Sequence, residues 1–171
     1  QGVSSAASDV YKRQFIGKDD GHNSASLICQ QLLHAQERDA LALAQAWQAW
    51  ETALTQRSYH PAPRAELDPP SAQALLAKYR LQSHYLMNHC FFPEAGLLSL
   101  LAPLKGLPVH LVHGRLDWIC LPQAAWAVHQ ALPHSQLSWV DNAGHNPFEP
   151  SMTSTLLQAI AGMVHQLSDK G

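Results

Sequence analysis

Apolar residues recur at helical spacing through much of the first half of the chain. Between Ser24 and Leu54 they return every three or four positions among good helix formers, with no proline inside the segment. Four prolines within residues 61–70 interrupt this pattern. Ser71 then has the character of an N-cap for a second helix over residues 71–92. We therefore predict that residues 15–95 form an all-helical block.

The hydrophobic pattern changes near Leu100. Residues 107–114 (LPVHLVHG) are a short, valine-rich apolar run of the kind that forms a parallel strand covered on both faces. Helical periodicity follows over residues 122–132, a second strand over 136–142, and a final amphipathic helix over 151–167, capped by Ser151. This order predicts a right-handed βαβ unit, and hence an α/β fold with parallel strands.

Composition narrows the classes of protein to which this chain can belong. Its 171 residues suffice for one domain or part of a larger one, and 46% of them are hydrophobic, which suits a globular protein with a core. The formal net charge of −2, without a Lys/Arg block, argues against a nucleic-acid or membrane partner. No apolar run is long enough to span a bilayer. Three cysteines without metal or disulfide spacing favour a reducing, cytoplasmic location.

The spacing of the histidines does not favour a metal site, and the first residues have no clear pattern. His110 and His113 form an H-x-x-H pattern, but on a strand they face opposite sides, and His84 and His89 lack helical ligand spacing, so we expect no metal site. Residues 1–14 (QGVSSAASDVYKRQ) lack clear periodicity and the apolar stretch of a signal peptide. They resemble translated adapter sequence, and we expect them not to be native.

Candidate chemistry lies just after the two predicted strands. Asp117 follows the glycine turn at the end of the first strand, and His145 follows Gly144 after the second. Ligands of parallel sheets bind beyond the carboxyl ends of the strands, so the two side chains should share one edge. An Asp can orient a histidine ring and stabilise its protonated form, and acid before histidine is the order of the α/β-hydrolase triad. The alternative is that Asp117 caps a loop and His145 is an ordinary turn residue.

The motifs around these residues make the resemblance more specific. HGRLDWICLPQAAWAVHQALP (113–133) and DNAGHNPFEP (141–150) resemble two motifs of the proline iminopeptidases, H-G-R-x-D-x-x-C-P continuing into A-W-x-x-H, and A-G-H-x-x-x-E-P. WQAWE (47–51) and YRLQSHYLMNHCFF (79–92) are similar to the W-x-x-W-E and R-I-E-x-H-Y-F segments of that family's cap domain. The resemblance covers roughly residues 40–165. It implies a helical cap over 15–95 and the C-terminal part of an α/β-hydrolase core over 96–171.

The resemblance also implies roles for individual residues. Asp117 would be the triad acid and His145 the general base. Glu51 would hold the free amino group of a peptide or amide substrate, since an ammonium needs a carboxylate partner. Cys120 would line the proline pocket, although packing of a buried thiol explains a cysteine there nearly as well.

This sequence departs from the family pattern at three positions. Gln82 stands where the family has a second amine-binding glutamate, and Leu86 where it has a pocket phenylalanine. Leu121 separates the cysteine from the proline. With one of two carboxylates replaced by an amide, strict selection of N-terminal proline is in doubt.

No G-x-S-x-G nucleophile elbow occurs in the 171 residues. We therefore expect this chain to be a C-terminal fragment of a serine-type hydrolase, and to be inactive by itself because it lacks the nucleophile. We expect the hydrolase to need no cofactor. We also expect the sheet of the fragment to have an open edge. Two alternatives remain: another amidase or esterase of the same fold, and a non-catalytic helical interaction module.

Overall fold

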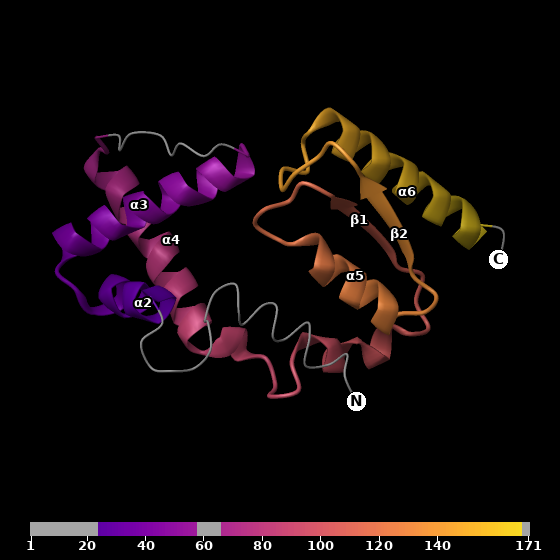
Figure 1. Cartoon of the computed structure of the whole chain (residues 1–171), viewed down its shortest axis with the longest axis horizontal. Coiled ribbons are helices and arrows are strands. Elements are labelled where there is room, and N and C mark those ends of the chain that lie inside the picture. Colours follow the sequence, from indigo (N-terminus) through magenta and orange to yellow (C-terminus); the bar gives the residue numbers. More distant parts are fainter. Residues whose placement is uncertain (1–23, 58–65, 169–171) are drawn as a thin grey trace.

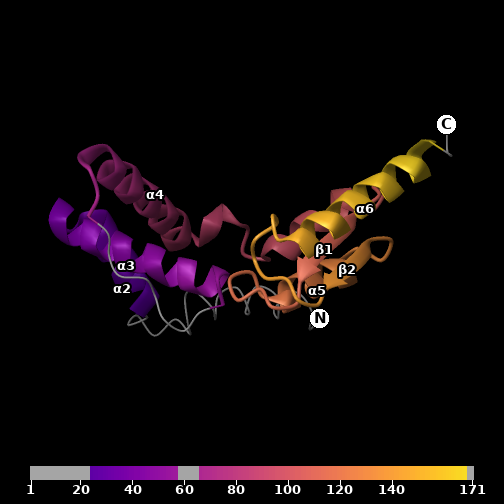
Figure 2. The ribbon, with the colours of Figure 1, turned by 90° about the horizontal axis from the view of Figure 1, so that it is seen from above.

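The computed structural model describes residues 24–57 and 66–168. In this part of the chain, three helices form one group, and two strands with two helices form a second group beside it (Figures 1 and 2). The expectation for residues 1–14 lies outside the described residues. The second group confirms the predicted α/β fold with parallel strands.

The first helical segment is two helices rather than one continuous helix over 24–54. Helix α2 (Ser24–His34) ends before a reversal, and α3 (Glu37–Thr55) starts after Gln36, whose backbone is extended with a ψ of 147°. Acidic residues in the first turn of α3, which favour a helix N-terminus, are the sequence signal for this break.

Packing explains why the chain reverses between α2 and α3. Leu32 of α2 and Ala44 of α3 are both fully buried against Tyr79 of the next helix. A single straight helix would place Leu32 and Ala44 about 18 Å apart along its axis. The reversal brings both onto one core, which buries more apolar surface than the straight helix could.

Helix α4 (Pro69–Met87) begins and ends earlier than predicted. Its N-cap is Asp68 rather than Ser71, because the Asp68 carboxylate accepts a 2.8 Å hydrogen bond from the backbone N–H of Ser71 and a proline occupies the first turn. The helix stops at Met87 instead of residue 92. The next element, η1 (His89–Phe91), consists of three residues with φ between 51° and 57°, which an α-helix cannot include.

The α/β part is built around two short parallel strands. β1 (His110–Gly114) pairs with β2 (Gln136–Val140) in a register that aligns Gly114 with Val140, and both strands are shorter than predicted. The other elements of this part are η2 (Leu97–Leu104), α5 (Pro122–Ala131) and α6 (Pro150–Ser168). Helix α6 begins at Pro150, so Ser151 lies inside its first turn rather than capping it.

Helices α5 and α6 lie on opposite sides of the two strands (Figure 1). Met152 of α6 packs on Val140 and Ala143, and this small cluster fixes the loop after β2 against the sheet. The outer face of α6 is apolar yet exposed at Leu157, Ile160, Val164 and Leu167. None of the helices in the described ranges combines the length and hydrophobicity needed to cross a bilayer.

Candidate active site

The ends of the two strands are joined by backbone hydrogen bonds that bring Asp117 toward His145. The N–H of Arg115 donates to the carbonyl of Val140, and that of Leu116 donates to the carbonyl of Ala143, each at 3.0 Å. Gly114 has no side chain at the tightest point, where an added Cβ would lie 2.5 Å from the carbonyl oxygen of Gly144. A glycine is required at this position because the backbone of the loop after β2 leaves no room for a Cβ atom.

The carboxylate of Asp117 is buried, and its hydrogen-bond partners lie on its own loop and on the loop after β2. Its Oδ1 accepts 2.8 Å hydrogen bonds from the backbone N–H groups of Ile119 and Cys120. Its Oδ2 lies 3.1 Å from Nδ1 of His145. Because a carboxylate only accepts, this geometry assigns the hydrogen to Nδ1 and leaves Nε2 of the neutral ring with the free lone pair.

The ring of His145 remains accessible. Its side chain is 39% exposed, whereas that of Asp117 is 6% exposed. An accessible basic nitrogen, held by a buried acid at the carboxyl edge of a parallel sheet, is suited to accept a proton from a neighbouring group.

His113, to which the sequence assigned no role at this site, helps to hold the acid's loop. Nε2 of His113, on β1, makes a 2.8 Å hydrogen bond to the carbonyl of Cys120 and lies 3.9 Å from Oδ2 of Asp117. Its ring packs edge-on against Trp139 of β2. The available signal was its position directly before Gly114, at the end of the strand that leads to the acid.

Cys120 lies next to the Asp117–His145 pair. Its thiol, a carboxylate oxygen of Asp117 and a ring nitrogen of His145 all lie within 4.8 Å of one another. Partial burial, and to a smaller extent the negative charge of Asp117, raise the pKa of this thiol above its ordinary value. An oxygen, a sulfur and a nitrogen atom, each able to bind a metal ion, thus lie close together beside the strand ends.

Glu51 and Gln82 form a second group on the helices. Oε1 of Glu51 accepts hydrogen bonds from Nε1 of Trp47 and Nε2 of Gln82, both at 2.9 Å. Its Oε2 accepts a 2.8 Å hydrogen bond from the hydroxyl of Tyr79, and the ammonium of Lys78 lies 3.6 Å away. Burial, and then the nearby Glu51, raise the pKa of Tyr79.

Leu86 lies one helical turn after Gln82 on α4, on the same side of the helix, and is half-buried. Within the described ranges, no hydrogen bond or ion pair directly joins the Glu51 group to the Asp117–His145 pair.

Arg57 connects the two groups indirectly. It lies just beyond α3, where its guanidinium donates to the carbonyl of Asn142 at 3.0 Å and lies 3.5 Å from Oε2 of Glu149. The other oxygen of Glu149 accepts from the N–H of Gly144, next to His145. In Figure 1 the C-terminal end of α3 faces the loop that follows β2.

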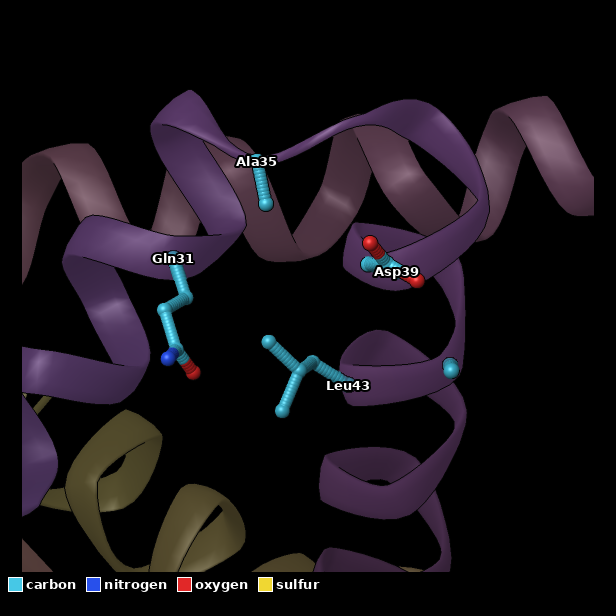
Figure 3. A pocket seen from close by; sticks show the side chains of 5 residues that line it. Gln31, Ala35, Asp39 and Leu43 are labelled. Carbon is cyan, nitrogen blue, oxygen red and sulfur yellow. The ribbon is translucent and has the colours of Figure 1, made fainter.

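A surface pocket lies elsewhere, between α2 and α3 (Figure 3), and is lined by Gln31, Ala35, Asp39, Ala42 and Leu43. None of the candidate residues lines it. Its one ionisable side chain has no acid or base opposite it among the lining residues, so this pocket does not suggest chemistry.

The two parallel strands with helices on both sides, next to a group of helices, fit the C-terminal part of an α/β-hydrolase. Comparison with known proteins is more specific. The chain is 34% identical over 138 residues to a proline iminopeptidase of Neisseria meningitidis, a match covering 80% of this chain and 42% of that protein. It is 32% identical over 167 residues to one of Xylella fastidiosa, covering 96% of this chain and 53% of that protein.

A plant relative extends the match beyond bacteria. A proline iminopeptidase of Arabidopsis thaliana is 35% identical over 121 residues, which are 69% of this chain and 31% of that protein. No family model matches the chain. The chain is therefore a relative of the proline iminopeptidases, as its motifs predicted, and spans about half the length or less of the curated relatives it matches.

Proposed function

We propose that these residues belong to a serine-type hydrolase that releases an N-terminal residue, in particular proline, from peptides. The observation that carries this proposal is the 3.1 Å contact between Nδ1 of His145 and Oδ2 of Asp117 at the strand ends. It leaves Nε2 of His145 as a base whose orientation and tautomer are fixed by a buried carboxylate.

In the proposed reaction, Nε2 of His145 takes the proton of a serine hydroxyl as its oxygen attacks the scissile carbonyl. His145 then returns this proton to the leaving amine, and Asp117 stabilises the imidazolium formed between the two steps. The serine and the oxyanion hole would come from outside these 171 residues. No cofactor takes part, and the proposed location is the cytoplasm.

Glu51 is the proposed partner of the substrate's ammonium group. A carboxylate offers about four lone-pair sites, of which Trp47, Gln82 and Tyr79 occupy three. An ammonium could bind at the remaining site or displace the amide of Gln82. Leu86 and Cys120 would line the adjoining pocket, residues 15–95 would form the cap, and residues 96–171 the C-terminal part of the core.

The second candidate is an amidase or esterase of the same fold without a need for an N-terminal amine. It is favoured by the environment of Glu51, where Lys78 supplies a competing positive charge at 3.6 Å and Gln82 supplies none of the negative charge that would attract an ammonium. These two features weaken the electrostatic selection of a free N-terminus.

The test uses the complete reading frame that contains these residues, expressed and assayed on a proline amide and on a simple ester. We expect preference for the proline amide, and His145→Ala to lower kcat by about 10³-fold or more. The exposed His134, which is not part of the site, supplies the matched control, His134→Ala, with unchanged kcat.

Equal turnover of amide and ester substrates would favour the second candidate. Unchanged activity after His145→Ala would contradict both candidates, and a complete reading frame without a nucleophilic serine would support the interaction module instead.

A further inference from the structure

The cluster of Asp117, Cys120 and His145 has the donor set of a transition-metal site. It offers one carboxylate oxygen, one thiol sulfur and one imidazole nitrogen, all within 4.8 Å of one another. Zn²⁺ is bound by these three donor types and prefers a tetrahedral arrangement. Hard cations such as Mg²⁺ and Ca²⁺ prefer all-oxygen sites, so the sulfur and nitrogen disfavour them.

The distances fit such an ion with a small adjustment. Bonds of about 2.0–2.3 Å in a tetrahedral zinc site place neighbouring donor atoms roughly 3.3–3.8 Å apart. Nδ1 of His145 and Oδ2 of Asp117 are already 3.1 Å apart. The sulfur of Cys120 needs to approach by about 1.5 Å at most, which a side-chain rotation at this exposed residue can provide.

The surrounding structure holds two of the donors in place before any ion arrives. Oδ1 of Asp117 is occupied by the N–H groups of Ile119 and Cys120, which directs Oδ2 toward His145. The carbonyl of Cys120 is held by Nε2 of His113. Outer contacts of this kind orient metal ligands and are costly to remove from known sites.

We propose that the chain binds one Zn²⁺ ion through Oδ2 of Asp117, Sγ of Cys120 and Nδ1 of His145, with water as the fourth ligand. On binding, the hydrogen on Nδ1 moves to Nε2 and the thiol loses its proton to solvent, so one proton is released for each ion. The positive ion reverses the effect of the Asp117 charge on the thiol, because it lies between the carboxylate and the sulfur.

Zn²⁺ binding at this cluster does not require the proposed hydrolase reaction. If that reaction occurs, the ion would replace the hydrogen shared by Asp117 and His145 and leave Nε2 protonated. The ion-bound state would then lack the base, so Zn²⁺ would be an inhibitor and not a cofactor.

The test titrates the purified 171-residue chain, without a histidine tag, with Co²⁺ as a spectroscopic substitute for Zn²⁺. We expect one Co²⁺ per chain, a near-ultraviolet thiolate-to-cobalt charge-transfer band, and stoichiometric displacement of Co²⁺ by Zn²⁺. A lightly buffered calorimetric titration should register release of one proton per Zn²⁺.

Two variants and one control assign the ligands. Cys120→Ser should abolish the charge-transfer band and weaken Zn²⁺ binding more than about tenfold, and His145→Gln should weaken it similarly. Both residues are exposed, so neither substitution should unfold the chain, which circular dichroism can verify. The control Cys90→Ser removes a cysteine outside the cluster and should leave the band and the affinity unchanged.

A charge-transfer band that persists in Cys120→Ser, or that disappears in Cys90→Ser, would overturn the proposal. Failure of the folded wild-type chain to bind Zn²⁺ at millimolar concentration would also overturn it. Neither result would bear on the hydrolase proposal, which the complete reading frame tests by turnover.

Discussion

Gly114 is the residue whose replacement should most sharply disturb the geometry between the strand ends. An added Cβ would lie 2.5 Å from the carbonyl oxygen of Gly144 and would also overlap the carbonyl group of Ala143. The first distance is about 0.9 Å short of ordinary van der Waals contact at 3.4 Å. All three contacted atoms belong to the backbone, so no side chain can rotate to relieve the overlap.

The loss of stability in Gly114→Ala can be worked out from the backbone atoms that must move. Overpacking of this kind costs typically about 1–3 kcal/mol. Moving the loop after β2 also stretches the 3.0 Å hydrogen bond from the N–H of Leu116 to the carbonyl of Ala143, at about 0.5–1.5 kcal/mol. We therefore expect the free energy of unfolding to fall by about 1.5–4.5 kcal/mol, and the contact between Asp117 and His145 to lengthen.

Urea unfolding followed by circular dichroism measures the stability change, and the chemical shifts of the His145 ring nitrogens report on its contact with Asp117. The matched control is Gly162→Ala, at an exposed position of α6 where an added Cβ meets nothing within 4 Å. It should stabilise the chain by about 0.5–1 kcal/mol, because alanine is the better helix former. A loss below about 0.5 kcal/mol in Gly114→Ala, which is the size of an ordinary surface effect, would refute the steric argument.

Tyr79→Phe should lower the free energy of unfolding by about 1.5–3 kcal/mol at neutral pH, because it removes a hydrogen bond to the Glu51 carboxylate. The control Tyr85→Phe, at an exposed ring, should change the free energy of unfolding little in the same urea assay. Because the pKa of Tyr79 is raised above its ordinary value of 10.0 in the fold, its contribution is complete below pH 10 and declines above it, so the difference between wild type and Tyr79→Phe should shrink as the pH rises past 10. A difference that stays constant with pH would contradict the assigned cause. Asp117→Asn should remove part of the rise in the pKa of the Cys120 thiol, since burial, the larger cause, remains. Alkylation of Cys120 at fixed pH should therefore become faster. Equal alkylation rates in the two proteins would contradict an electrostatic effect of Asp117.

The sequence predicted the kinds of elements well because their apolar periodicity is local information. It did not predict the reversal between α2 and α3, because that break depends on burial of Leu32 and Ala44 against Tyr79, which lies over thirty residues further along the chain. The end of α4 was missed for a related reason, since apolar residues continue through residue 92 while the backbone does not remain helical.

The candidate site was partly accessible to sequence reasoning. The rule that the carboxyl ends of parallel strands share an edge predicted that Asp117 and His145 would be neighbours. The roles of His113 and Arg57 in holding the surrounding loops depend on contacts that only the fold forms; the position of His113 before Gly114 was a partial signal, whereas no local pattern marks Arg57. Neither histidine nor cysteine spacing along the chain marks the cluster of Asp117, Cys120 and His145, because only the fold brings these three residues together.

The Arg57 bridge ties the C-terminal end of α3 to the loop that follows β2. Arg57 lies six positions after Glu51, and the chain between them is helical as far as Thr55, a rise of roughly 6 Å from Glu51. A tilt of the three helices would consequently pull on the loop bearing His145 or break the Arg57 contacts to it. Deleting one residue between Glu51 and Thr55 would turn Glu51 by about 100° around the axis of α3 relative to Arg57. This is a far larger disturbance than most side-chain replacements would cause.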